Sequence, residues 1–327
     1  MTTRFDVLNI GNAIVDIIAH AEDDFLVREN IIKGAMNLID TERAEHLYSV
    51  MGPASEQSGG SAGNTAAGIA SLGGRAAYFG KVSDDHLGTV YTHDMRAIGV
   101  HYETAKLPGE PPTARSMIFV TPDGERSMNT YLGSCVELGP EDIDEEIVAS
   151  SQITYFEGYL WDPPRAKEAI RKAADIAHAN GRRMSMTLSD PFCVDRYRDE
   201  FLDLMRSGTV DLVFANEHEL VSLYQTSSFD EAVKAVREDC EVTAVTRSEK
   251  GSVVVTRERT ETVHAHPIEK LVDTTGAGDA FVGALAVGLA RGESVREAAL
   301  LATRVAAASV RQLGAQPSYP WQGDDLP

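Results

Sequence analysis

The stretch VDTTGAGDAF, residues 272–281, places a small glycine-containing turn directly before a long helical pattern. The turn is GAG at residues 276–278, and Asp279 stands at the mouth of the helical residues 280–291. Backbone amides at such a helix start can converge on an anion, because no bulky side chain stands in the way. A carboxylate beside a phosphate-sized anion site suits removal of a proton from an attacking hydroxyl. The stretch therefore predicts phosphoryl transfer from a nucleotide to an alcohol, unless Asp279 is only a first-turn acid that the helix dipole favours.

The composition is typical of a globular protein with room for one large α/β core and a small appendage. Apolar residues make up 43% of the 327 residues, and 30 Lys and Arg oppose 50 Asp and Glu, which gives a formal charge of −20. Such a charge repels phosphate backbones and anionic membrane surfaces. We therefore expect neither nucleic acid nor a membrane as a partner.

The start of the chain and its cysteines indicate a cytoplasmic protein. Asp6, Asn9 and Asn12 interrupt the apolar start, which argues against a signal peptide. No apolar run reaches the roughly 18 residues of a spanning helix. The three cysteines are far apart in the chain, and this spacing suits reduced thiols better than a disulfide framework or a metal site.

Most of the chain alternates short β-like runs with amphipathic helical stretches. This rhythm is typical of a doubly wound α/β fold, in which a mostly parallel sheet carries helices on both faces. The expected strands are residues 5–11, 75–82, 153–159, 183–188, 211–215 and 242–246, followed by a hairpin over 252–264. The expected helices are residues 64–72, 84–97, 163–180, 194–206, 229–238 and 294–313.

Two segments break this rhythm, residues 17–40 and residues 102–131. The second is predicted to be strand, turn, strand, because its PDG turn at residues 122–124 has a proline that presets φ and a glycine that accepts a positive φ. We expect the two segments to form a small β-sheet lid that closes over a substrate and excludes water, or else a rigid edge decoration. The large domain would then consist of residues 1–16, 41–101 and 132–327.

Polar groups beside glycines suggest a site for a hydroxylated acceptor. In SGGSAGNTAAG, residues 58–68, Gly59 and Gly60 permit close backbone approach, and Asn64 can both donate and accept hydrogen bonds. Asp16 follows the first expected strand and could accept hydrogen bonds from two vicinal hydroxyls. Each of these residues could also be an ordinary loop, cap or turn residue.

The nucleotide site is expected at strand ends, because the chain has neither a GxxxxGK[ST] loop nor a GxGxxG turn. Asn216 and Glu219 follow the strand at 211–215, where open α/β sheets bind ligands, and could hold a hydrated Mg²⁺. The alternative is a helix start with acids in its first turn. The turn TRSEKG, residues 246–251, could contact ribose or phosphates. Arg126 in the lid could reach a transferring phosphate, although a lone arginine is often a solvated charge.

These motifs, in this order, resemble the ribokinase-like (PfkB) family of carbohydrate and nucleoside kinases over nearly the whole chain. VDTTGAGDAF resembles the C-terminal signature of that family, and residues 59–88, GGSAGNTAAGIASLGGRAAYFGKVSDDHLG, resemble its N-terminal signature. ANEHE, residues 215–219, resembles its N-x-x-E motif. The resemblance implies a ribokinase-like fold and transfer of the γ-phosphate of ATP to a primary hydroxyl.

The resemblance also implies roles for individual residues. Asp279 would be the base, and the anion hole would be formed by Gly276, Ala277 and Gly278. The acceptor would be held by Asn12, Asp16, Gly59, Gly60, Asn64 and Arg126. ATP and Mg²⁺ would be bound by Asn216, Glu219, Thr246, Arg247, Gly251 and Thr274, with Glu219 reaching Mg²⁺ through water. Family members respond to K⁺, which Asp273 and Thr275 could hold.

Within the family, several segments are most similar to adenosine kinases: GNAIVD (11–16), GERSMNTYLG (124–133), FEGYLWDPP (156–164) and MTLSDPFC (186–193). Their aromatic and apolar residues suit stacking on a nucleobase. The expected acceptor is therefore the 5′ hydroxyl of a nucleoside, adenosine first, in purine salvage. The alternative is a sugar kinase of the same family that acts on ribose, fructose or a ketodeoxy sugar acid.

Two readings from other classes have less support. A ligand-binding sensor on the same scaffold would not need the intact Asp279, and a dinucleotide oxidoreductase would need the missing GxGxxG turn. The strand pattern leaves both a monomer and a homodimer open.

Overall fold

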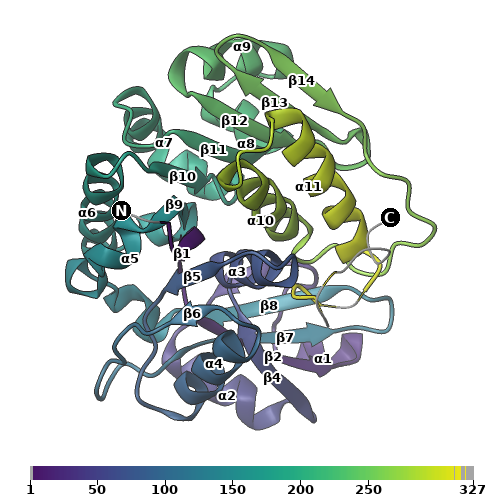
Figure 1. Ribbon diagram of the computed structural model, residues 1–327. Coiled ribbons are helices and arrows are strands. Elements are labelled where there is room, and N and C mark those ends of the chain that lie inside the picture. Colours follow the sequence, from purple (N-terminus) through teal and green to yellow (C-terminus); the bar gives the residue numbers. More distant parts are fainter. Residues whose placement is uncertain (1–2, 313, 318–320, 322–327) are drawn as a thin grey trace.

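Strand β1 (Phe5–Ile10) lies inside the larger of two sheets, and all six of its residues are buried. A parallel strand that is covered on both faces has a nearly continuous apolar sequence, as FDVLNI does. The computed structural model describes residues 3–312, 314–317 and 321. In this part of the chain the sheet has nine strands in the order β14-β13-β12-β11-β10-β9-β1-β5-β6, and only β13 runs opposite to the others, so that it pairs antiparallel with both β12 and β14 (Figure 1).

The other strands of the larger sheet are β5 (Ala76–Phe79), β6 (His101–Tyr102), β9 (Ser151–Glu157), β10 (Arg183–Thr187), β11 (Leu212–Asn216), β12 (Val242–Thr246), β13 (Ser252–Thr256) and β14 (Thr260–Val263). The smaller sheet contains β2 (Ile14–His20), β3 (Met36–Leu38), β4 (Ala54–Gly59), β7 (Ala114–Val120) and β8 (Arg126–Tyr131). The helices are α1 (Asp23–Arg28), α2 (Thr41–Val50), α3 (Ser61–Ser71), α4 (His86–Ala97), α5 (Glu145–Ala149), α6 (Pro164–Ala179), α7 (Pro191–Arg206), α8 (Glu217–Leu223), α9 (Phe229–Asp239), α10 (Ala277–Ala290) and α11 (Val295–Ser309).

Helices cover both faces of the larger sheet. Along β11, Leu212 and Phe214 pack into one core with α3, α10 and α11, whereas Val213 and Ala215 pack into a second core with α5 to α9 (Figure 1). This alternation is the period of two that a strand imposes on its side chains. The predicted doubly wound α/β fold with a second, smaller sheet is confirmed.

The smaller sheet has the order β3-β8-β7-β2-β4 and also has two different faces. Ile17 and Phe119 pack into the first core beside α1 and α2, whereas Asp16, Ser116 and Ile118 face a cavity. The predicted hairpin of β7 and β8 is present, with antiparallel pairing between Arg115 and Tyr131 at its open end. One face of this sheet therefore contributes to the core and the other is free to line a site.

The predicted boundaries of the two parts were wrong at three places. Residues 41–59 belong with the smaller sheet, because α2 packs on β7 and β8 and β4 pairs with β2. The sequence of β4, ASEQSG, is polar and has no strand-like apolar pattern. Its backbone hydrogen bonds to β2 nevertheless make it a strand. Asp16 lies in β2 of the smaller sheet, not in the large part, and Tyr102 belongs to β6 of the larger sheet.

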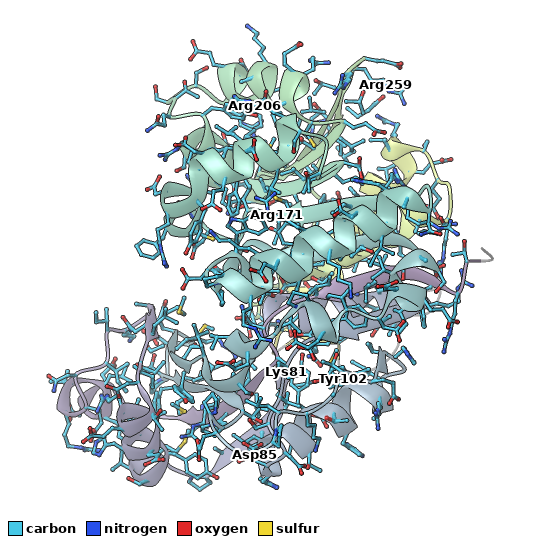
Figure 2. The ribbon with its side chains drawn as sticks, turned by 90° about the vertical axis from the view of Figure 1, so that its left-hand side faces the viewer. Lys81, Asp85, Tyr102, Arg171, Arg206 and Arg259 are labelled. Carbon is cyan, nitrogen blue, oxygen red and sulfur yellow. The ribbon has the colours of Figure 1, made fainter. Side chains whose placement is uncertain are left out.

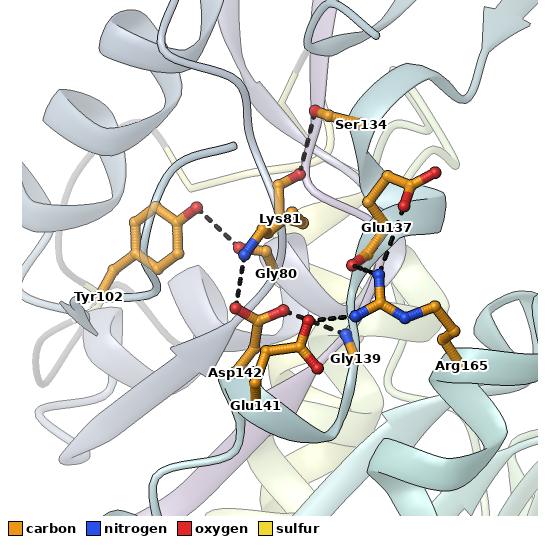
Figure 3. A network of polar contacts seen from close by, with 9 residues as sticks. All are labelled: Gly80, Lys81, Tyr102, Ser134, Glu137, Gly139, Glu141, Asp142 and Arg165. Atoms are coloured by element: carbon orange, nitrogen blue, oxygen red, sulfur yellow. Dashed lines mark hydrogen bonds and ion pairs between the residues drawn. The ribbon is translucent and has the colours of Figure 1, made fainter. Parts of the chain in front are cut away.

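A buried ion pair lies near the junction of the two parts. Lys81 Nζ is 2.5 Å from Asp142 Oδ1, and both side chains are more than nine-tenths buried. In the same network, the Tyr102 hydroxyl donates to the carbonyl of Gly80, and Ser134 donates to the carbonyl of Lys81 (Figure 3). Figure 2 shows Lys81 and Tyr102 between the part that contains Asp85 and the part that contains Arg171. Since separating this pair would leave a buried charge without a partner, the network resists rearrangement of the junction.

Two sequence-based expectations concern cysteines and membranes. Cys135, Cys193 and Cys240 are buried and free, as expected for reduced thiols. Among the described residues, no helix is long and apolar enough to cross a membrane.

Candidate active site

The start of α10 leaves backbone amides open to a ligand. Gly276 caps the helix with a φ of 75°, and a Cβ there would lie 2.5 Å from the carbonyl oxygen of Ala315. The amide of Ala277 donates to the carbonyl of Thr274, which is exposed in the preceding turn. The amides of Gly278 and Asp279 have no hydrogen-bond acceptor among the described residues. Free amides at the positive end of a helix favour an anion, and binding of a phosphate at this place stays a prediction.

Asp279 faces α3 from this helix start, and both of its oxygens accept hydrogen bonds. Ser61 Oγ donates to Asp279 Oδ1 at 2.7 Å, and Asn64 Nδ2 donates to Asp279 Oδ2 at 3.1 Å. Burial raises the pKa of Asp279 to about 6, while the two hydrogen bonds act in the opposite direction. The carboxyl group is therefore mostly ionised at neutral pH, and its pKa is close enough to neutral pH for it to accept a proton from a substrate.

Asp16 is a second buried carboxyl group that faces the same cavity from β2. Burial raises its pKa to about 7, the charge of Arg126 lowers it, and the charge of Asp279 raises it further. The predicted glycines are needed beside it. A Cβ on Gly59 would lie 2.6 Å from the carboxyl carbon of Asp16, and a Cβ on Gly60 would lie 2.3 Å from the carbonyl oxygen of Asn12.

These groups line a cavity of about 780 Å³ between the two sheets. One part of its lining is polar and contains Asn12, Asp16, Asn64 and Asp279. Another part is aromatic and apolar and contains Met36, Leu38, Ile118, Tyr159, Phe192 and Tyr197. The cavity opens at the carboxyl ends of β1 and β9, which is where open α/β sheets bind ligands.

The aromatic segment at residues 156–164 divides between the core and the cavity. Phe156 and Trp161 are fully buried in the core between the sheet and α6 and α7, so they cannot stack on a ligand. Tyr159 is 37% exposed and lines the cavity. The aromatic side chains in the cavity lining are therefore Tyr159 and two residues of α7, Phe192 and Tyr197. Tyr159 is distant from the other two in the sequence but lines the same cavity.

Arg126 bridges the two parts of the molecule. Its Nη1 donates to Asp273 Oδ2 at 2.9 Å, and both side chains are more than nine-tenths buried. Thr275 and Gly314 also donate to the carboxylate of Asp273, and these hydrogen bonds outweigh burial and lower its pKa. Arg126 does not line the cavity in this structure, and its contact with a phosphate stays a prediction, as does a potassium ion at Asp273 and Thr275.

Apart from Thr274, the residues predicted to hold the nucleotide lie at the carboxyl ends of β11 and β12 or shortly after them. Asn216 ends β11 and is paired in register with Thr246 at the end of β12. Asn216 caps α8, and its backbone and side-chain amides donate to the two oxygens of Glu219 at 2.9 and 2.5 Å. Their contact with nucleotide or metal stays a prediction.

The turn after β12 is held by its own contacts. Arg247 makes two hydrogen bonds to Glu217, the first residue of α8. Gly251 has a φ of 90°, and a Cβ there would lie 2.1 Å from the carbonyl oxygen of Val263. No group of three or more potential metal ligands occurs in the described part of the chain.

Sequence reasoning missed Glu157, which lies at the centre of the site. Glu157 is 1% exposed and accepts hydrogen bonds from the backbone and side chain of Asn12 and from the backbone of Ala62. Burial raises its pKa to about 7. Its place as the last residue of β9 was a usable signal, because ligands bind at such strand ends.

An anion-binding helix start, a carboxylate base and a cavity at the strand ends are the parts that a phosphotransferase needs. Residues 33–322 match the model of the pfkB family of carbohydrate kinases. The chain therefore belongs to this family and is a kinase with the ribokinase-like fold.

Individual relatives carry different names. The chain is 62% identical to a solved adenosine kinase from Sinorhizobium meliloti, which it matches over 97% of each chain with a TM-score of 0.91. It is 60% identical to a solved probable sugar kinase from Rhizobium etli, over 98% of this chain and 97% of that chain, with a TM-score of 0.92. It is also 26% identical to adenosine kinase of Saccharomyces cerevisiae, over 95% of this chain and 96% of the relative.

Proposed function

We propose that this kinase transfers the γ-phosphate of ATP to the 5′ hydroxyl of a nucleoside, and that the nucleoside is adenosine. The observation that carries the proposal is the mixed lining of the cavity, which contains both carboxylates that could bind hydroxyls and aromatic side chains that could stack on a base. A free sugar would use the polar part alone, whereas a nucleoside offers a ribose to the polar part and a base to the aromatic part. The similarity to adenosine kinases supports the same acceptor.

The residues of the chain would divide the reaction between them. Asp16 would bind ribose hydroxyls. Asp279 would take the proton from the 5′ hydroxyl as its oxygen attacks the γ-phosphorus, while the bond from that phosphorus to the bridging oxygen of the β-phosphate breaks and ADP leaves. The amides of Gly278 and Asp279 would face the negative charge of the transferring group. Closure of the smaller sheet over the cavity would exclude water, which otherwise competes as the acceptor.

The chain offers a sparse site of the kind that Mg²⁺ uses. This ion keeps several waters and needs only one or two carboxylates besides the phosphates of its nucleotide. Glu219 is 4% exposed, and its pKa is raised to about 7 by burial and then by the charge of Asp190. Glu219, with Asn216 beside it, would hold Mg²⁺ through water, and the ion would neutralise part of the phosphate charge. The buried, free cysteines support a reducing, cytoplasmic setting for this chemistry.

The test is an ATP-consumption assay with Mg²⁺ and K⁺ that compares adenosine, other nucleosides, ribose and fructose. Turnover with adenosine at micromolar concentrations would support the proposal. Turnover with a free sugar alone would make the protein a sugar kinase that uses the same base. The absence of turnover with any of them would contradict the nucleoside acceptor.

A further inference from the structure

Gln316 reaches into the site from the segment that follows α11. Its Nε2 donates to the carbonyl of Ser58 at 2.8 Å and to Asn64 Oδ1 at 3.2 Å. Ser58 belongs to β4 of the smaller sheet, and Asn64 belongs to α3. Figure 1 shows the chain after α11 returning to the region beside α3 and β8. Gln316 lies outside the sequence motifs of the site.

Only one orientation of the Asn64 side-chain amide can satisfy both of its hydrogen bonds. The amide has a donor end and an acceptor end, and a carboxylate can only accept. Asn64 must therefore turn its Nδ2 toward Asp279, which directs its Oδ1 toward Gln316. A donor at that position holds the orientation, whereas an acceptor there would favour the reverse one and would place Oδ1 of Asn64 against the carboxylate.

We infer that Gln316 is a positioning residue that orients Asn64, and through it the carboxylate of Asp279, for proton transfer. The chain of contacts runs from Gln316 to Asn64 to Asp279, while Ser61 holds the other oxygen of Asp279. The same Nε2 also donates to Ser58 of β4. The orientation of the base thus depends on a segment 252 residues away from Asn64 in the chain. The inference rests on the proposed role of Asp279 as the base.

Other ionisable groups face Asp279 and must be considered in any titration. Asp16 of β2 and Glu157 and Tyr155 of β9 each interact with its charge, and Arg126 of β8 acts on Asp16. Gln316 is uncharged, so replacing it with leucine changes none of these charges. A change in the titration of Asp279 would then report the hydrogen bond from Asn64.

The experiment is a ¹³C NMR titration of the Asp279 carboxyl group in wild-type protein and in Gln316→Leu, without acceptor or nucleotide. Loss of the Gln316 donor should weaken the hydrogen bond from Asn64 and raise the pKa of Asp279 by about 1. Activity at pH 6 should then fall about fivefold while activity at pH 8 changes little, because ionised Asp279 becomes scarce only near its pKa. Gln316→Glu, which keeps the size but presents an acceptor, should give a larger upward shift.

Gln312→Ala is the matched control, because Gln312 lies in the same region and its side chain donates, among the described residues, to the backbone carbonyl of Gln316 alone. It should leave the pKa of Asp279 unchanged. An unchanged pKa in Gln316→Leu, or an equal shift in Gln312→Ala, would overturn the inference. If Gln316→Leu does not fold, Gln316→Met, which is also uncharged and cannot donate a hydrogen bond, decides in its place. The titration needs no turnover, so its result stays separate from any failure to phosphorylate adenosine.

Discussion

Helices α10 and α8 begin in similar ways and end up with different tasks. Each follows a loop or strand end of the larger sheet, and each carries an acid three residues after its cap, Asp279 after Gly276 and Glu219 after Asn216. Burial raises the pKa of both acids, to about 6 for Asp279 and about 7 for Glu219. At α8, however, the Asn216 side chain accepts from the amide of Glu219, and Glu219 accepts from both amides of Asn216.

The difference lies in the cap residue. An asparagine supplies an oxygen that occupies one of the free amides, and the acid then completes a reciprocal capping box. A glycine supplies no side chain, so the amides stay available to a ligand and the acid is free to turn toward another element. The comparison indicates that a helix start can bind a ligand when its own cap leaves its amides without a hydrogen-bond acceptor.

The largest effect is expected from Asp279→Asn, which keeps the shape of the side chain but removes the base. Turnover should fall at least about 100-fold, since general-base catalysis contributes about that much or more. Acceptor affinity, measured by calorimetry, should change little. Asp203→Asn, at an exposed site on α7, serves as the control and should keep full activity. A rate above about a tenth of wild type in Asp279→Asn would remove Asp279 from the role of base.

Gly276→Ala tests whether the α10 start needs its glycine. The added Cβ would meet the carbonyl of Ala315, and the positive φ alone costs about 1–2 kcal/mol for a non-glycine residue. We expect the free energy of unfolding to fall by about 2 kcal/mol or more and the KM for ATP to rise, because the amides shift. Gly292 has a φ of 84° and open space around it, so Gly292→Ala should lower the free energy of unfolding only by the cost of the positive φ. Equal effects in the two variants would show that close packing at Gly276 is unimportant.

Activity and stability should respond to pH in opposite directions. Asp279 acts as a base only when ionised, so kcat should fall about tenfold per pH unit below its pKa of about 6. Asp16, Glu157, Glu219 and Asp279 all have folded-state pKa values above their usual ones. Their stabilising contribution is complete only below about pH 4, where the unfolded groups are also protonated, and it is lost progressively as the pH rises to about 7. Rate profiles and urea unfolding from pH 5 to 8 measure both, and a flat rate profile would contradict the assignment of the base.

The smallest effect is expected from Asn216→Ala, which removes the cap of α8. Loss of an asparagine cap lowers the free energy of unfolding by about 1 kcal/mol. Ser228→Ala removes the corresponding cap of α9 and should cost a similar amount. If Asn216 also takes part in nucleotide binding, only Asn216→Ala should raise the KM for ATP. Equal kinetics in the two variants would limit Asn216 to capping.

The reach of sequence reasoning can be judged from particular residues. The α10 start was predictable because a glycine cap, its open amides and an acid three residues later are all local features. Strand β4 was missed because its residues are polar and its pairing partner, β2, lies about 35 residues earlier in the chain. Trp161 stands in the aromatic segment that was expected to suit stacking on a base, but it lies in the core beyond the 3₁₀ turn that follows β9.

By itself, the sequence determined the alternation of strands and helices, the family to which the chain belongs, and the identity of Asp279 and its glycine turn. Each of these depends on spacings of a few residues, which backbone geometry interprets directly. Only the tertiary structure decided that Ser61, Asn64 and Gln316 meet around that acid, that Glu157 holds Asn12 and Ala62, and that Arg126 pairs with Asp273. These contacts join residues that are between 95 and 252 positions apart, so they exist only after the sheets have formed.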